Sequence, residues 1–82
     1  MVEEAKKIVK DYAKEHLDKS DENGSEEFDV YVVWQVKALQ NWKFMITTSL
    51  RDGMYYELTF DGENREWYLD AYKKFENRVI NA

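Results

Sequence analysis

Apolar residues in the first part of the chain recur at intervals of three and four. This spacing places them along one side of a helix. Glu3 and Glu4 lie where the positive end of a helix dipole favours acidic side chains, and no proline interrupts the segment. The pattern therefore predicts a helix over residues 2–19. Its apolar stripe consists of Val2, Ala5, Ile8, Val9, Tyr12, Ala13 and Leu17.

Between residues 28 and 60 the pattern changes from helical spacing to simple alternation. Successive side chains of a strand point to opposite faces, so each alternating run has one apolar face. We expect three antiparallel strands whose even-numbered residues, Trp34 and Trp42 among them, face the core. The even positions are Phe28, Val30, Val32, Trp34, Val36 and Ala38, then Trp42, Phe44, Ile46, Thr48 and Leu50, then Met54, Tyr56, Leu58 and Phe60.

Two three-residue loops would keep even residues opposite even residues across the sheet. Residues 51–53 fit a type I turn followed by a bulge, with Gly53 in the left-handed conformation. Residues 39–41 fit the same loop, with Asn41 in that role. Paired residues of an antiparallel ladder share a face, so these loops predict one consistent register. The register pairs Val36 with Phe44, Trp34 with Ile46, Thr48 with Tyr56 and Ile46 with Leu58.

The last part of the chain supports two interpretations after a turn at residues 61–64. In the first, residues 65–69 form a short fourth strand, and a helix follows from residue 70. In the second, a helix starts at once, with Asn64 as its N-cap. Both interpretations end in a helix whose core-facing residues are Tyr72, Phe75, Val79 and Ile80.

These elements predict an α+β fold of the order α-β-β-β-(β)-α. It comprises an N-terminal helix, a three- or four-stranded antiparallel meander and a C-terminal helix. Both helices are expected on one sheet face, because the large apolar side chains of all the strands lie on the even-numbered side. With 82 residues, the chain has the length of a single α+β domain, over residues 1–82.

Composition narrows the classes of function. The formal net charge of −5 argues against general binding to nucleic-acid backbone or to anionic lipid. No apolar stretch approaches the ~20 residues that a membrane helix needs, and the acidic start at Glu3 does not resemble a secretory signal. The absence of cysteine excludes disulfides and thiolate metal sites. We expect a cytoplasmic protein that binds neither nucleic acid nor membrane.

Reactive residues do not assemble into a catalytic or metal site. His16 is the only histidine, and it lies near the end of the predicted helix without a neighbouring nucleophile. In the acidic loop over residues 20–27, Gly24 is fourth from the first acid, whereas a calcium loop needs glycine at its sixth position. We predict no catalytic residue, no metal, no cofactor and no enzymatic activity. The loop is interpreted as solvated. The alternative is that its acids, Asp21, Glu22, Glu26 and Glu27, bind a basic site on a partner.

The odd-numbered face of the predicted sheet is the most informative surface. No predicted helix covers it, and Tyr, Met, Val and Thr with few charges are typical of protein interfaces. The alternative is a half-solvated sheet face, on which β-forming residues are favoured anyway. The candidate partner-binding residues are Tyr31, Val33, Met45, Thr47 and Tyr55.

Five segments resemble a known group of proteins. They are AKKIVKDY at 5–12, YVVW at 31–34, LQNW at 39–42, DGMYYE at 52–57 and YLDAYKKFEN at 68–77. They are similar to small uncharacterised proteins, a domain of unknown function, encoded by phages and prophages of low-GC Gram-positive bacteria. The likeness spans nearly the whole chain. The group has no assigned activity, so no functional residues carry over, and what the resemblance implies is a phage gene product that acts in the bacterial cytoplasm.

The residue patterns, with the phage origin that the resemblance implies, lead to two candidate functions. The favoured one is a phage-encoded accessory protein that binds a host or anti-phage defence protein, or a second copy of itself, through the odd-numbered face or the acidic loop. The alternative is a protein that binds a small ligand or nucleotide signal without catalysis. Its pocket would lie between the first helix and the sheet, lined by Tyr and Trp, with lysines from the first helix.

Overall fold

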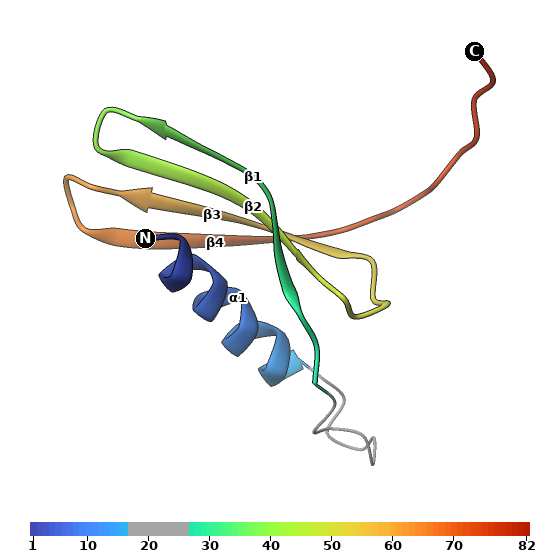
Figure 1. Ribbon diagram of the computed structural model, residues 1–82, viewed down its shortest axis with the longest axis horizontal. Coiled ribbons are helices and arrows are strands. Elements are labelled where there is room, and N and C mark those ends of the chain that lie inside the picture. Colours follow the sequence, from blue (N-terminus) through green and yellow to red (C-terminus); the bar gives the residue numbers. More distant parts are fainter. Residues whose placement is uncertain (17–26) are drawn as a thin grey trace.

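The computed structural model describes residues 1–16 and 27–82, which form one helix packed on a four-stranded antiparallel sheet (Figure 1). The strands follow one another in the sheet as they do in the sequence, so the first and the fourth strand are its two edges. The elements are α1 (Val2–His16), β1 (Val30–Ala38), β2 (Asn41–Thr48), β3 (Met54–Asp61) and β4 (Glu66–Lys73).

The helix α1 confirms the predicted N-terminal helix over the residues that the structure describes. Its buried side chains are Ala5, Val9 and Ala13, which are small and therefore let the helix approach the sheet closely. Lys14 and His16 occupy the last turn, where positive charge is favoured by the helix dipole. The final predicted positions, residues 17–19, lie outside the described residues.

The core lies between α1 and the two central strands. Tyr12 of α1 meets the ring of Tyr56 on β3 edge to face, with 5.6 Å between the ring centroids. Toward one end of the sheet, Trp67 of β4 lies against Phe60 of β3 at 5.0 Å. The even-numbered core face predicted for β2 and β3 is confirmed. Its most buried residues are Phe44, Ile46, Tyr56 and Leu58.

A bulge in β1 overturns part of the predicted register. Val32 pairs with Ile46, but Trp34 pairs with Met45. Val33 is therefore the extra residue, and the side chains that follow it change face. Trp34 is 41% exposed, so its predicted place in the core and its predicted pairing with Ile46 are wrong.

The turn between β1 and β2 accounts for this bulge. It has two residues, Leu39 and Gln40, because Ala38 already pairs with Asn41. Leu39, rather than the predicted Asn41, has a positive φ, of 59°. A two-residue turn shifts the pairing of β1 with β2 by one position relative to a three-residue loop. The extra residue at the bulge shifts it by one more position, so that even-numbered residues at the start of β1 again pair with even-numbered residues of β2.

Across the turn between β2 and β3, even-numbered residues pair with even-numbered residues as predicted, but the individual pairs differ. Gly53 has a φ of 69°, which confirms its left-handed conformation. Ile46 pairs with Tyr56 rather than with Leu58, so the ladder is displaced by two residues. The longer turn is held by Asp52, whose Oδ1 accepts a hydrogen bond from the N–H of Met54 at 3.1 Å.

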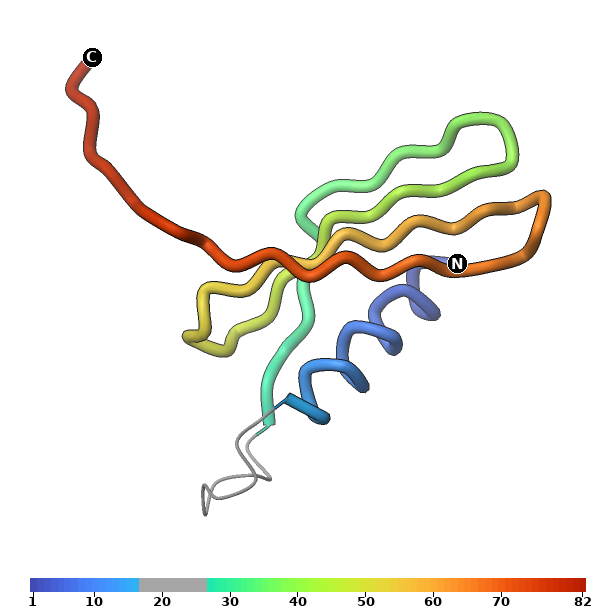
Figure 2. The backbone as a smooth tube through the Cα atoms, turned by 180° about the vertical axis from the view of Figure 1, so that it is seen from behind, coloured from blue at the N-terminus to red at the C-terminus, as the bar shows by residue number. Residues whose placement is uncertain are grey.

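The predicted C-terminal helix is wrong. The fourth strand of the first interpretation is present, and it extends from Glu66 to Lys73, further than predicted. Residues 74–82, here called the arm, form neither helix nor strand and extend away from the sheet (Figures 1 and 2). Phe75, Val79 and Ile80 of the arm are 99%, 90% and 85% exposed.

Pairing with β3 outweighs the helical spacing of the last apolar residues. Tyr72, Phe75 and Val79 have that spacing, but β3 offers backbone partners as far as Met54, which pairs with Lys73. This ladder takes Tyr72 into β4. The arm that remains is shorter than the roughly 12–15 residues that an isolated helix needs in water, and α1 already packs on the face where the second helix was expected.

Candidate functional site

The sheet face opposite α1 is covered by no other element among the described residues, and we call it the open face. The strand register arranges its side chains in rows that cross all four strands. The residues in these rows point away from the buried face because side chains alternate along each strand. The rows are Tyr31, Thr47, Tyr55 and Tyr72; Trp34, Met45, Glu57 and Asp70; and Val36, Lys43, Thr59 and Tyr68.

Large side chains line both edges of the open face. On β1, Tyr31, Trp34 and Val36 are 50%, 41% and 51% exposed. On β4, Tyr68 and Tyr72 are 49% and 52% exposed. The open face therefore presents two aromatic margins with a half-buried centre between them.

The structure places the predicted partner-binding residues together. Tyr31, Thr47 and Tyr55 share one row, and Met45 lies in the next row. Val33 is the bulged residue of the adjoining edge strand and is 53% exposed. The predicted partner-binding residues did not include Trp34, Val36 and Tyr72, and Tyr68 was considered for the open face but not included among them.

The signals for these missed residues differ in strength. Trp67, Leu69 and Ala71 alternate with outward-facing residues, as in a strand with one face toward the core. The predicted fourth strand ended at residue 69, and following the alternation to residue 73 would have put Tyr72 on the open face beside Tyr68. The face on which Trp34 lies depends on the register shift at the bulge, and the hydrophobic pattern gives no sign of that shift.

Acidic neighbours hold the hydroxyl groups of two open-face tyrosines. The hydroxyl of Tyr31 donates to Asp29 Oδ2 at 3.3 Å, and that of Tyr68 donates to Glu66 Oε2 at 2.7 Å. The negative charge of Asp29 raises the pKa of Tyr31, and the hydrogen bond to Glu66 raises the pKa of Tyr68. Both phenols stay neutral near pH 7. These hydrogen bonds restrict the motion of the two tyrosine side chains. The side chains therefore lose less conformational entropy when a partner binds.

The open face carries more acid than base. On the central strands, Lys43 Nζ lies 3.4 Å from Glu57 Oε1. Besides Glu57, four acids lie on this side of the strands, which favours a partner with basic groups. Alternation along the strands and the contact with Tyr31 assign these four acids: Asp29, Asp61, Glu66 and Asp70.

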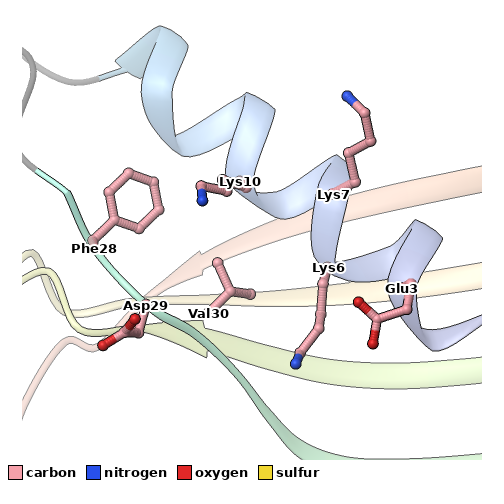
Figure 3. Close-up of a pocket in the computed structure, with 7 residues that line it drawn as sticks. All are labelled: Glu3, Lys6, Lys7, Lys10, Phe28, Asp29 and Val30. Atoms are coloured by element: carbon pink, nitrogen blue, oxygen red, sulfur yellow. The ribbon is translucent and has the colours of Figure 1, made fainter.

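A shallow pocket of about 330 Å³ lies where α1 passes the start of β1 (Figure 3). Lys6 and Lys10 contribute to it, whereas Lys7 points away and binds Asp11 Oδ2 at 2.7 Å. The lining contains neither Tyr nor Trp, so it differs from the aromatic pocket that a nucleotide signal was expected to need. The lining residues are Glu3, Lys6, Lys7, Lys10, Phe28, Asp29 and Val30.

The other candidates offer little chemistry. The ring of His16 stacks on Tyr12 at 4.1 Å between centroids, and its Nδ1 lies 2.9 Å from the Tyr12 carbonyl oxygen. Within residues 1–16 and 27–82, no group of three or more His, Asp or Glu side chains could hold a metal ion, and no helix is long and apolar enough to cross a membrane. In the acidic loop, Glu27 is exposed, and the other candidates, Asp21, Glu22 and Glu26, lie outside the described residues.

Comparison with known protein families identifies the chain. A model described as "Family of unknown function (DUF6275)" matches residues 2–82. The chain belongs to DUF6275. The description of DUF6275 carries no activity, so the choice of a functional surface rests on the residues and the structure. No curated protein and no solved structure matches this DUF6275 chain.

Proposed function

We propose that the chain is a non-catalytic protein-binding module whose binding surface is the open face. The observation that carries this proposal is the collection of large, half-exposed side chains on one side of the sheet. Apolar residues are often exposed singly, but here they gather at two margins, one along β1 and one along β4, and such clustering is typical of an interaction site. Tyr and Trp also contribute most of the binding energy in many interfaces. The exposed members are Tyr31, Trp34, Val36, Tyr68 and Tyr72.

The bulge at Val33 supports a role for Trp34 in recognition. The register in which Val32 pairs with Ile46, continued along β1, would point Trp34 toward α1, where burial of its large side chain would stabilise the fold. The bulge and the two-residue turn together instead put Trp34 beside Met45 on the open face, at 41% exposure. Bulges often redirect a side chain at functional sites. The stability given up by exposing Trp34 is consistent with a binding role for it.

The shape of the open face suits a protein partner better than a small molecule. Small ligands bind in concave sites that surround most of their surface. The rows of the open face lie instead on a pleated sheet, with the Lys43–Glu57 ion pair at the centre. A protein surface can cover both aromatic margins and reach the acidic groups at the same time.

The proposed setting is the cytoplasm of a bacterial host. The resemblance to phage and prophage proteins supports a phage-encoded accessory role, in which the module inhibits a host or anti-phage defence protein. The acid-rich open face fits a partner surface that presents Lys or Arg, because opposite charges speed association and fix the register of docking.

The small-ligand alternative rests on Lys6 and Lys10 in the pocket beside α1. Glu3 and Asp29 in the same lining oppose the binding of a phosphate. A rise in melting temperature with a nucleotide, abolished by Lys6→Ala with Lys10→Ala, would favour this function over protein binding.

Quantitative capture from a bacterial host lysate tests the proposed function. Immobilised native protein should enrich a specific host protein, and Trp34→Ser with Tyr68→Ser should lose it while retaining the native circular dichroism spectrum. Leu39→Ser is the matched control, because Leu39 is 93% exposed at a hairpin tip outside the open face. Equal capture by the open-face variant and the control would contradict the proposal.

A further inference from the structure

The two edges of the sheet are protected differently. β1 is interrupted by the bulge at Val33, and such irregularities usually prevent a further strand from adding to an edge. β4 has no interruption, because it pairs residue by residue with β3 from Glu66 to Lys73. Its outer backbone groups have no strand partner in the described part of the chain. β4 is therefore an edge that can accept another strand.

The arm has the composition of such a strand and continues directly from β4. The N–H of Lys74 donates to the carbonyl oxygen of Gly53 at 2.7 Å. Beyond it, Phe75, Val79 and Ile80 are 85–99% exposed. Large apolar side chains gain free energy when they leave water, and the arm runs away from its own sheet (Figure 2). A partner outside this chain would bury them.

We propose that two copies of the chain exchange arms, so that each arm adds as a fifth strand along the outer edge of β4 in the other copy. The pairing is antiparallel around a two-fold axis at Lys74, which faces its own counterpart. Every contact then occurs twice, as in other two-fold dimers. The mode of binding is strand addition to a free sheet edge.

The direction of the backbone groups agrees with this register. The N–H of Lys74 points toward β3, so the even-numbered residues of β4 turn their backbone groups inward and the odd-numbered residues turn theirs outward. Pairing around Lys74 sets odd residues opposite odd residues, with Val79 opposite Leu69. The unpaired groups of the two strands therefore meet.

Side-chain chemistry selects this register over its neighbours. It sets Arg78 opposite Asp70 and Ile80 opposite Tyr68. An axis at residue 73 would set Glu76 opposite Asp70, and an axis at residue 75 would set Ile80 opposite Asp70. Like charges, or an apolar group facing a carboxylate, are unfavourable across strands. The two Lys74 side chains at the proposed axis have long stems whose ammonium groups can reach water.

This dimer differs from the proposed function in the surface it uses. The arm of the second copy lies beside Tyr68 and Asp70 at the β4 margin of the open face, and the rest of that face, including Tyr31 and Trp34, stays uncovered. Sedimentation velocity of the full chain measures the dimer directly. We expect a species of twice the 9.9 kDa of one chain. Arg78→Glu should weaken the dimer by about tenfold, since the two-fold axis repeats the lost pair. Arg78→Glu combined with Asp70→Arg should restore it, whereas the control Arg51→Glu, at an exposed turn position, should not change it.

Cysteine cross-linking tests the register, because the chain has no native cysteine. Tyr68→Cys protein mixed with Ile80→Cys protein should form a disulfide between chains, since directly paired residues meet the distance that a disulfide requires. In a mixture of Tyr68→Cys and Arg78→Cys proteins, the second cysteine lies two residues away from the position opposite residue 68. This mixture should therefore cross-link far less.

Three results would overturn the proposal. The first is a monomer at about 100 μM, where even a weak dimer would be populated. The second is equal cross-linking of the two cysteine mixtures. The third is a dimer that Trp34→Ser disrupts and Arg78→Glu does not, because the second copy would then sit on the open face. Loss of host-protein capture with an intact dimer would concern the proposed function alone.

Discussion

The helix face and the open face are built from the same four strands, yet burial separates them. On the helix face, Phe44, Ile46 and Leu58 have no exposed surface, whereas on the open face Trp34 and Tyr72 are 41% and 52% exposed. Alternation gives each strand residue to one face only. Stability and the proposed recognition of a partner therefore depend on different side chains, and substitutions should affect one without the other.

Phe44→Ala should cause the largest loss of stability. Phe44 is fully buried, with Trp42 at 5.8 Å and Trp67 at 6.0 Å between ring centroids. Removing such a side chain costs about 3–5 kcal/mol, which can unfold a small domain that has as little as about 5 kcal/mol of stability. Urea denaturation followed by circular dichroism measures this loss. A change below about 1 kcal/mol, as for surface positions, would mean that the core lies elsewhere.

Gly62→Ala should have the next largest effect, at the end of the sheet where the two hairpins meet. An added Cβ would overlap the carbonyl oxygen of Gln40, and the N–H of Gly62 donates to Asn41 Oδ1 at 3.0 Å. Such overpacking costs about 1–3 kcal/mol. Gly53→Ala, where the strain comes from the positive φ alone, should cost about 1 kcal/mol. Urea melts that rank the two variants in the opposite order would contradict this reading of the turns.

Trp34→Ser should change stability little although it removes one of the largest side chains. Trp34 is half-exposed on the open face, so we expect a loss of up to about 1 kcal/mol, close to the range for surface substitutions. The same urea melts measure it beside Phe44→Ala. A loss as large as that of Phe44→Ala would show that Trp34 belongs to the core, in the register that pairs it with Ile46 rather than with Met45.

The effect of tyrosine titration on stability at alkaline pH should give the smallest difference between the two faces. Burial raises the pKa of Tyr56 on the helix face above its usual 10.0. A raised pKa means that folding favours the neutral phenol, so this contribution is complete below about pH 10 and is lost as the pH rises through the folded-state pKa. Tyr56→Phe should therefore reduce the alkaline loss of melting temperature more than Tyr68→Phe, since the exposed Tyr68 is screened by water. An equal effect would contradict the difference in burial.

Local patterns predicted those parts of the fold that depend on neighbours in the sequence. The spacing of Ala5, Val9 and Ala13 predicted α1, and Gly53 predicted the left-handed turn residue. Alternation predicted the core face of β2 and β3. The same alternation grouped Tyr31 and Tyr55, which the structure places in one row of the open face.

The missed features depend on contacts between distant residues. Val33 follows other β-branched residues, so the hydrophobic pattern does not reveal that it is unpaired. The turn that requires the bulge places Leu39 at a φ of 59°, where glycine or asparagine would have been expected. Tyr72 satisfied a helical spacing, and only the ladder with β3 decides that it is in a strand.

Radical footprinting with mass spectrometry, on the free chain and on its complex with a captured partner, measures both faces in one experiment. In the free chain, Tyr31, Trp34, Tyr68 and Tyr72 should be labelled strongly and the buried Tyr56 weakly. In the complex, the four open-face residues should lose their labelling while the exposed Leu39 keeps it. Unchanged labelling of those four, with protection elsewhere, would show that the partner binds another surface.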